Sequence, residues 1–172
     1  MDDRAGMEEA IGALVQGDLE QRRAAVHTLE KAGAPAIPLL IRLLRETGNN
    51  DVRWYAAVAL SRIGASAIAP LLEAMKEPGN TQFRRYAAAA LGEIGTPAVG
   101  PLIDAMKTDD AELRGMIALA LCKIGQPSIG PLTHAMEHGD DLLKRCAALA
   151  LWKMGEQGIT ALVQNVKDEC ES

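Results

Sequence analysis

Aromatic side chains are scarce in this sequence, whose 172 residues include two Trp, two Tyr and one Phe. A β-sandwich or an aromatic-lined ligand cavity draws on these large side chains, so we expect neither. The hydrophobic fraction of 48% consists instead mostly of Ala, Leu, Ile and Met, which favour closely packed helices. The chain is long enough to bury the core of one all-helical domain.

Cysteine and long apolar runs are also lacking. The three cysteines, Cys122, Cys146 and Cys170, form no Cys-x-x-Cys pair and are too few for a disulfide framework. We find no signal-peptide pattern and no apolar stretch of about eighteen residues that could cross a membrane. These absences predict a cytoplasmic protein with free thiols and no membrane attachment, and we assign no cofactor.

Positive charge is not in excess, because 18 Lys and Arg stand against 23 Asp and Glu, for a net charge of −5. This balance opposes binding to polyanions unless basic residues gather on one face. We therefore do not expect the chain to bind nucleic acid.

A stretch with the outline of a phosphate-binding loop, Gly95-Thr-Pro-Ala-Val-Gly-Pro101, proves to be part of a repeat. A Walker loop needs Lys and Ser/Thr after its second glycine, and here Pro101 and Leu102 follow. The same stretch recurs at Gly125–Pro131 and, in a variant form, at Gly64–Pro70. We therefore interpret it as architecture.

Alignment of the chain with itself gives five repeats, at 18–48, 49–79, 80–109, 110–139 and 140–169, after a half-repeat cap at 6–17. Each repeat is predicted to contain two helices. The first begins after an N-cap at Asp18, Asn49, Asn80, Asp110 or Asp140. It ends at Gly33, Gly64, Gly95, Gly125 or Gly155, where we expect the left-handed conformation.

The second repeat illustrates the expected core. Its first helix should bury Val52, Ala56, Ala59, Leu60 and Ile63, and its second Ile68, Leu71, Leu72 and Met75. One such hairpin buries too little apolar surface to fold alone, so stacked neighbours must complete the core, as in a solenoid.

The motif Arg-x-x-Ala-Ala-x-Ala-Leu-x-x-Ile-Gly followed by Ala-Ile/Val-x-Pro-Leu, at residues 53–71 and 84–102, resembles the short HEAT repeats of phycobilin-lyase subunits and many small bacterial and archaeal proteins. The resemblance covers residues 18 to about 168. It implies an all-α fold, a right-handed α-solenoid of five two-helix repeats with the N-terminal half-repeat cap, forming one domain over residues 1–172.

The aligned repeats contain one column of basic residues on the first helices and two columns of variable residues on the second helices. Basic residues recur at Arg22, Arg53, Arg84, Arg114 and Lys144, and we expect them to form ion pairs with acidic groups of adjacent repeats rather than an anion-binding stripe. On the second helices, two columns vary in sign and type, reading Arg42, Glu73, Asp104, His134, Gln164 and Glu46, Glu77, Thr108, His138, Asp168.

These variable columns should line the inner, concave surface, over a floor of Ala74, Ala105 and Ala135. We expect a mixed, mostly acidic groove that suits a peptide or helix of a partner protein, with an ordinary solvated surface as the alternative. Apolar residues also recur on the outer face of the first helices, at Trp54, Val58, Leu119, Cys122, Leu149 and Trp152. This outer row is a candidate contact for a partner or a second copy of the chain.

The segment His134-Ala-Met-Glu-His138 matches the His-x-x-Glu-His pattern of some metalloproteases. Glu137, however, aligns with Lys76, Lys107 and Lys167, a column that we expect to be ordinary exposed surface. We therefore assign no metal site and no catalytic residues, and expect at most incidental metal binding.

The leading hypothesis is a non-enzymatic interaction module that binds protein or peptide through Arg42, Glu73, Glu77, Asp104, His134, His138 and Gln164, or through the outer row with Trp54 and Trp152. Resemblance to phycobilin-lyase subunits implies the alternative of a tetrapyrrole-handling protein, with Tyr55, Tyr86 and Cys146 as residues of interest. A third hypothesis is DNA binding, as in HEAT-like alkylpurine glycosylases, which the acidic residues of the groove oppose.

Overall fold

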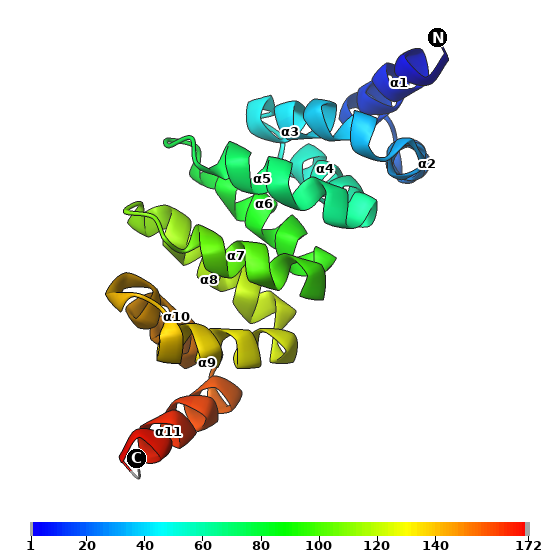
Figure 1. Ribbon diagram of the computed structural model, residues 1–172. Coiled ribbons are helices and arrows are strands. Elements are labelled where there is room, and N and C mark those ends of the chain that lie inside the picture. Colours follow the sequence, from blue (N-terminus) through cyan, green and yellow to red (C-terminus); the bar gives the residue numbers. More distant parts are fainter. Residues whose placement is uncertain (1, 171–172) are drawn as a thin grey trace. The chain divides into compact units, whose positions relative to one another are not determined.

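A computed structural model describes residues 2–170, with side chains described for residues 4–163. Every regular element in this range is helical (Figure 1), which confirms the all-α prediction. The α-helices are α1 (Asp2–Gln16), α2 (Leu19–Ala32), α3 (Ile37–Glu46), α4 (Asn50–Ile63), α5 (Ile68–Met75), α6 (Thr81–Ile94), α7 (Val99–Ala105), α8 (Ala111–Ile124), α9 (Ile129–His138), α10 (Asp141–Lys153) and α11 (Glu156–Cys170). Short 3₁₀ turns at Ala34–Ala36, Gly64–Ala67, Thr96–Ala98 and Gln126–Ser128 join four of the pairs.

The helices form two compact units, Met1–Ile94 and Gly95–Ser172. In the first unit, α2, α4 and α6 pack in one row, while α1, α3 and α5 form a second row beside it. The second unit repeats this arrangement, with α8 and α10 in one row and α7, α9 and α11 in the other. This packing is that of solenoid repeats, and the assignment of residues 1–172 to a single domain stays a prediction.

The predicted N-caps are all confirmed. The side-chain oxygens of Asp18, Asn80, Asp110 and Asp140 each accept a hydrogen bond from the backbone N–H three residues later, and Asn49 accepts from Asp51 and Val52. These bonds satisfy amide hydrogens that the first turn of a helix leaves without a partner. The caps therefore fix where each first helix begins.

All five glycines that end the first helices, Gly155 included, have positive φ, but the predicted left-handed helical conformation was wrong for four of them. Gly33, Gly64, Gly95 and Gly125 have φ between +64° and +81° and ψ between −135° and −141°. The left-handed helical region lies at ψ of roughly +30° to +60°. The observed region is open essentially to glycine alone, so the requirement for glycine at the turn is stronger than predicted.

The predicted core is mostly confirmed. Val52, Ala56, Ala59 and Leu60 of α4 and Ile68, Leu71 and Met75 of α5 are buried. Ile63 and Leu72 were predicted as core but are only half-buried. Ile63 is the last residue of α4, and Leu72 lies at the edge of the apolar stripe of α5. Residues 50–75 are apolar enough to match the composition of a membrane-spanning helix, but they fold as α4 and α5 with the turn at Gly64 between them.

In the basic column, Arg22 and Arg114 bond to backbone carbonyls and Arg53 to a neutral side chain, so the predicted ion-pair ladder was wrong for these three residues. Arg22 donates to the carbonyl of Val15 at 3.4 Å, Arg114 donates to the carbonyl of Thr108, and Arg53 donates to the side chain of Asn50. In the described part of the chain, no carboxylate pairs with these three. Carbonyls at helix ends carry partial negative charge and attract a guanidinium.

Arg84, on α6, is the most deeply buried member of the basic column, with 1% of its surface exposed. Its Nε donates to the carbonyl of Met75, the last residue of α5, at 2.9 Å. A buried charge needs such hydrogen bonds to offset its lost hydration. Arg84 therefore ties the end of α5 to the next helix.

Candidate functional site

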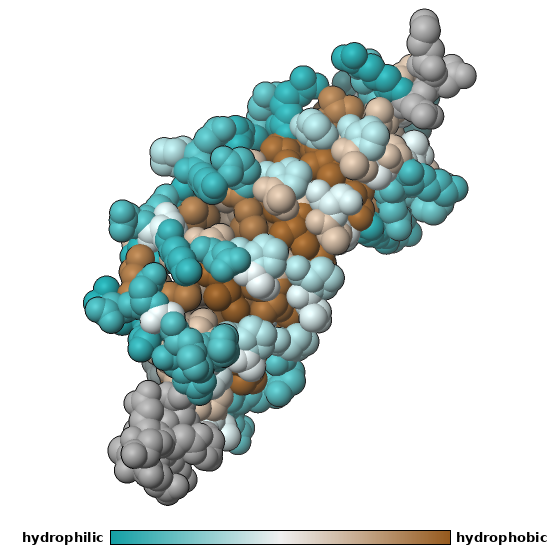
Figure 2. Space-filling model, viewed as in Figure 1, coloured by the Kyte–Doolittle hydropathy of each residue, from teal (hydrophilic) through white to brown (hydrophobic). Residues whose placement is uncertain are grey.

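A groove of about 810 Å³ runs between α3 and α5 of the first unit, and we call it the α3–α5 groove. Apolar side chains gather over these two helices, with polar side chains at their margins (Figure 2). The floor consists of Ile37, Pro38, Ile41, Pro70 and Ala74, and the rim includes Arg42, Arg45, Glu46, Glu73, Lys76 and Glu77.

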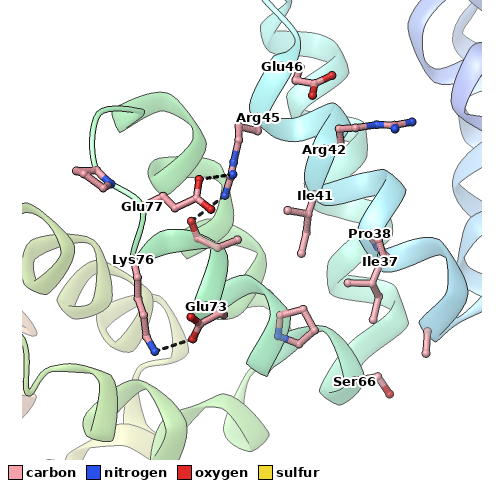
Figure 3. Close-up of a pocket in the computed structure, with 14 residues that line it drawn as sticks. Ile37, Pro38, Ile41, Arg42, Arg45, Glu46, Ser66, Glu73, Lys76 and Glu77 are labelled. Atoms are coloured by element: carbon pink, nitrogen blue, oxygen red, sulfur yellow. Dashed lines mark hydrogen bonds and ion pairs between the residues drawn. The ribbon is translucent and has the colours of Figure 1, made fainter.

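The floor arises because the apolar stripe of α3 is wider than the part that the neighbouring helices cover. Leu40 and Leu44 are fully buried against the neighbouring helices. Ile41 lies at the edge of this apolar stripe and is only half-buried. Its side chain is directed into the groove (Figure 3). On α5, Pro70 lies within the first turn, where its missing N–H breaks no helical bond. Both α3 and α5 therefore contribute apolar side chains to the floor of the groove.

Two ion pairs order the charged rim (Figure 3). Arg45 of α3 reaches across to Glu77 and donates to the carbonyl of Ala74 at 3.0 Å. Lys76 pairs with Glu73 at 2.6 Å. The guanidinium of Arg45 also lies 5.0 Å from the ring centroid of Phe83 on α6. Arg45 thus connects the first repeat with α5 and α6.

Two rim charges are left without an ion-pair partner in the described part of the chain. Arg42 and Glu46 are both exposed on α3, and neither makes a described salt bridge. Figure 3 shows both side chains pointing away from the Arg45–Glu77 pair. Among the residues that the structure describes, the groove therefore offers Arg42 as a cation and Glu46 as an anion without an ion-pair partner, beside an apolar floor.

The structure places Arg42, Glu73 and Glu77 around the α3–α5 groove, and their role in binding a partner stays a prediction. Asp104, His134 and His138 are exposed on α7 and α9 of the second unit, and Gln164 lies outside the residues whose side chains are described. Sequence reasoning missed Ile41, Arg45 and Lys76. Because Arg45 and Lys76 add positive charge, the expectation of a mostly acidic groove was wrong for the first unit, where the rim is balanced.

The four largest side chains of the outer row are exposed to solvent. Trp54 of α4 is 54% exposed, Leu119 of α8 52%, Leu149 of α10 53% and Trp152 of α10 62%. In the second unit α8 packs beside α10, so three of these side chains belong to neighbouring helices. Val58 and Cys122 are only half-buried.

The residues singled out for tetrapyrrole handling lie in different settings. Tyr55 is half-buried, and its ring contacts the ring of Trp54 edge to face, with the two centroids 4.8 Å apart. The guanidinium carbon of Arg22 lies 5.6 Å from the centroid of the Tyr55 ring. Tyr86 is half-buried beside Arg85. Cys146, in the second unit, is only 9% exposed, which leaves little thiol surface for attachment of a ligand.

Comparison with known proteins gives one family. The family model described as HEAT repeats matches residues 7–81, 68–152 and 101–172. A search of curated proteins returns no match. Among solved structures, a designed armadillo repeat protein in complex with the peptide (KR)4 shares 16% identity over 91% of this chain and 90% of that chain, with a TM-score of 0.35. An engineered protein shares 22% identity over 98% of this chain and 87% of that chain, with a TM-score of 0.37.

Proposed function

The chain belongs to the HEAT-repeat family, and on that premise we propose that it is a non-enzymatic interaction module whose α3–α5 groove binds a segment of a partner protein. Stacked helical repeats present extended surfaces of this kind to their partners. The observation that supports the proposal most strongly is the open apolar floor between two charged rims. An apolar centre with a polar rim is the usual anatomy of a protein interface.

The groove also suggests what the partner segment contains. We infer that its floor, beside Ile41 and Pro70, accepts apolar side chains of the segment. Arg42 can pair with a carboxylate of the segment, and Glu46 with a basic side chain, because neither has a described partner of its own. We infer a short segment with an apolar centre and mixed charge, and we do not propose nucleic acid, because the rim has no excess of positive charge.

A random peptide library displayed on phage tests this proposal. Peptides selected on the wild-type chain should lose at least about tenfold in affinity with Ile41→Asp, since an added carboxylate would be buried without a partner. Arg42→Glu should disfavour peptides with an acidic flank. Leu19→Asp, at an exposed position at the start of α2 and outside both the groove and the outer row, is the matched control and should bind as wild type does. Failure to select any peptide, or equal binding by Ile41→Asp, would refute the proposal.

A second candidate function is self-association through the outer row, favoured in the second unit by the exposure of Leu119, Leu149 and Trp152 on the neighbouring helices α8 and α10, and in the first unit by the exposure of Trp54. Large exposed apolar side chains in one area commonly mark a contact surface. Sedimentation velocity of wild type and of the Trp54→Ala/Trp152→Ala variant tests it. We expect a concentration-dependent dimer that the double variant lacks, and a wild-type monomer at every concentration would remove this candidate.

The tetrapyrrole alternative has less support, because Cys146 is buried. Adding a bilin and recording its absorbance spectrum tests it, with no spectral change expected.

We also propose a reducing, cytoplasmic location, to which the free thiols of Cys122 and Cys146 are suited.

A further inference from the structure

Three side chains with metal-ligating atoms lie together at the C-terminal end of α9. His134, Glu137 and His138 each offer one such atom, and these atoms all lie within 4.8 Å of one another. Spacings of three and four residues place side chains on one face of a helix, which explains the cluster. All three are exposed, so an ion can reach them without any opening of the fold.

The two imidazole rings, of His134 and His138, are stacked on one another. Their centroids lie 4.4 Å apart at an interplanar angle of 28°. Nδ1 of His138 lies 3.2 Å from the carbonyl oxygen of His134. In the tautomer with the proton on Nδ1, that nitrogen donates to the carbonyl, and Nε2 keeps the lone pair that a metal ion needs.

We propose that His134, Glu137 and His138 form a binding site for a divalent transition-metal ion of the zinc type. Imidazole nitrogen with one carboxylate is a donor set suited to zinc, nickel or copper. Calcium and magnesium prefer a shell of oxygen ligands, which this trio does not provide. His138 is the last residue of α9, and the partial negative charge at a helix C-terminus further favours a cation there.

This proposal departs from the expectation from sequence, which assigned no metal site. That expectation relied on Glu137 sharing a column with lysines in other repeats. In the structure Oε2 of Glu137 lies 3.6 Å from Nδ1 of His138, so this glutamate belongs to the same cluster as the histidines. Zinc takes four ligands, and three protein ligands leave a position for water or an added ligand.

Isothermal titration of the full chain with zinc chloride, and separately with nickel chloride, tests the proposal. We expect one ion per chain with a Kd tighter than about 100 µM. The His134→Asn/His138→Asn variant should lose at least tenfold in affinity while keeping its circular dichroism spectrum. It retains all three cysteines, so any thiol binding persists in it. His27→Asn is the matched control, because His27 is also exposed on a helix beside a glutamate, Glu30.

Each outcome is decisive. Loss of affinity in the double variant, with wild-type affinity in His27→Asn, supports the site. Wild-type affinity weaker than the threshold, full affinity in the double variant, or an equal loss in His27→Asn overturns it. Glu137→Gln should weaken zinc binding less than loss of both histidines, and an unchanged affinity would contradict its role as a ligand. Magnesium chloride should give no binding under the same conditions.

Discussion

Gly64 is the residue on which the α4–α5 hairpin turns. Its φ of +80° and ψ of −139° place it where a side chain is strongly disfavoured. A Cβ added there would meet nothing within 4 Å, so the cost of a substitution is conformational rather than steric.

Gly64→Ala should therefore destabilise the protein by about 1–3 kcal/mol. The control is Gly115→Ala, in the interior of α8, where an added Cβ also meets nothing within 4 Å and φ is not positive. Alanine at this helical position should stabilise by about 0.5–1 kcal/mol. Urea denaturation measures both changes, and equal effects of the two substitutions would refute the argument.

Cys122 gives a second prediction at the residue scale. Burial raises the pKa of its thiol above the ordinary value, and nearby Lys153 acts in the opposite direction more weakly. Because the thiolate is the reactive form, alkylation of folded protein near neutral pH should be slower than in denaturant. The rate should rise about tenfold per pH unit until the pKa is reached.

Peptide mass spectrometry of residues 115–123, which contain Cys122 alone among the cysteines, measures this rate. The same protein in guanidinium chloride is the control. An equal rate in the folded and unfolded protein at neutral pH would contradict the raised pKa.

At the scale of the element, local signals and long-range contacts differ in how well the sequence predicts them. The N-caps at Asp18, Asn49 and Asp140 could be predicted because a cap and its amide partner lie within three residues. The burial of Arg84 could not, because it depends on the carbonyl of Met75, which the packing of α5 on α6 brings within reach.

The same difference explains what was missed in the α3–α5 groove. The exposed columns with Arg42, Glu73 and Glu77 follow from helical periodicity alone. The role of Arg45 depends on α3 packing beside α5 and near Phe83, which periodicity does not reveal. Each aligned column, considered alone, therefore predicted that its side chains are exposed. It did not predict which side chains of neighbouring helices form ion pairs.

Arg45→Ala should destabilise the protein by about 1–2 kcal/mol. The half-exposed ion pair with Glu77 contributes little, while the hydrogen bond to Ala74 and the contact with Phe83 contribute about 1 kcal/mol together or somewhat more. Arg42→Ala, one turn earlier on α3, is the control and should change stability by less than about 0.5 kcal/mol. Thermal or chemical unfolding distinguishes them, and a smaller effect at Arg45 than at Arg42 would contradict the described linkage.

At the scale of the whole molecule, the central claim is that neighbouring hairpins stabilise one another and are interchangeable as structural units. The repeat 49–79 contributes α4 and α5, which pack against α2, α3 and α6. Its removal joins Gly48 to Asn80 and so keeps the order of glycine and N-cap found at the start of this repeat. In a repeat protein, stability is approximately a sum of repeat and interface terms.

Unfolding of the variant lacking residues 49–79, followed by far-UV circular dichroism, tests this claim most directly. We predict wild-type helical signal per residue and one cooperative transition at a lower denaturant concentration, since interfaces have been lost but the hairpins still stack. Loss of the helical signal in buffer, or a gradual and non-cooperative change, would contradict the account.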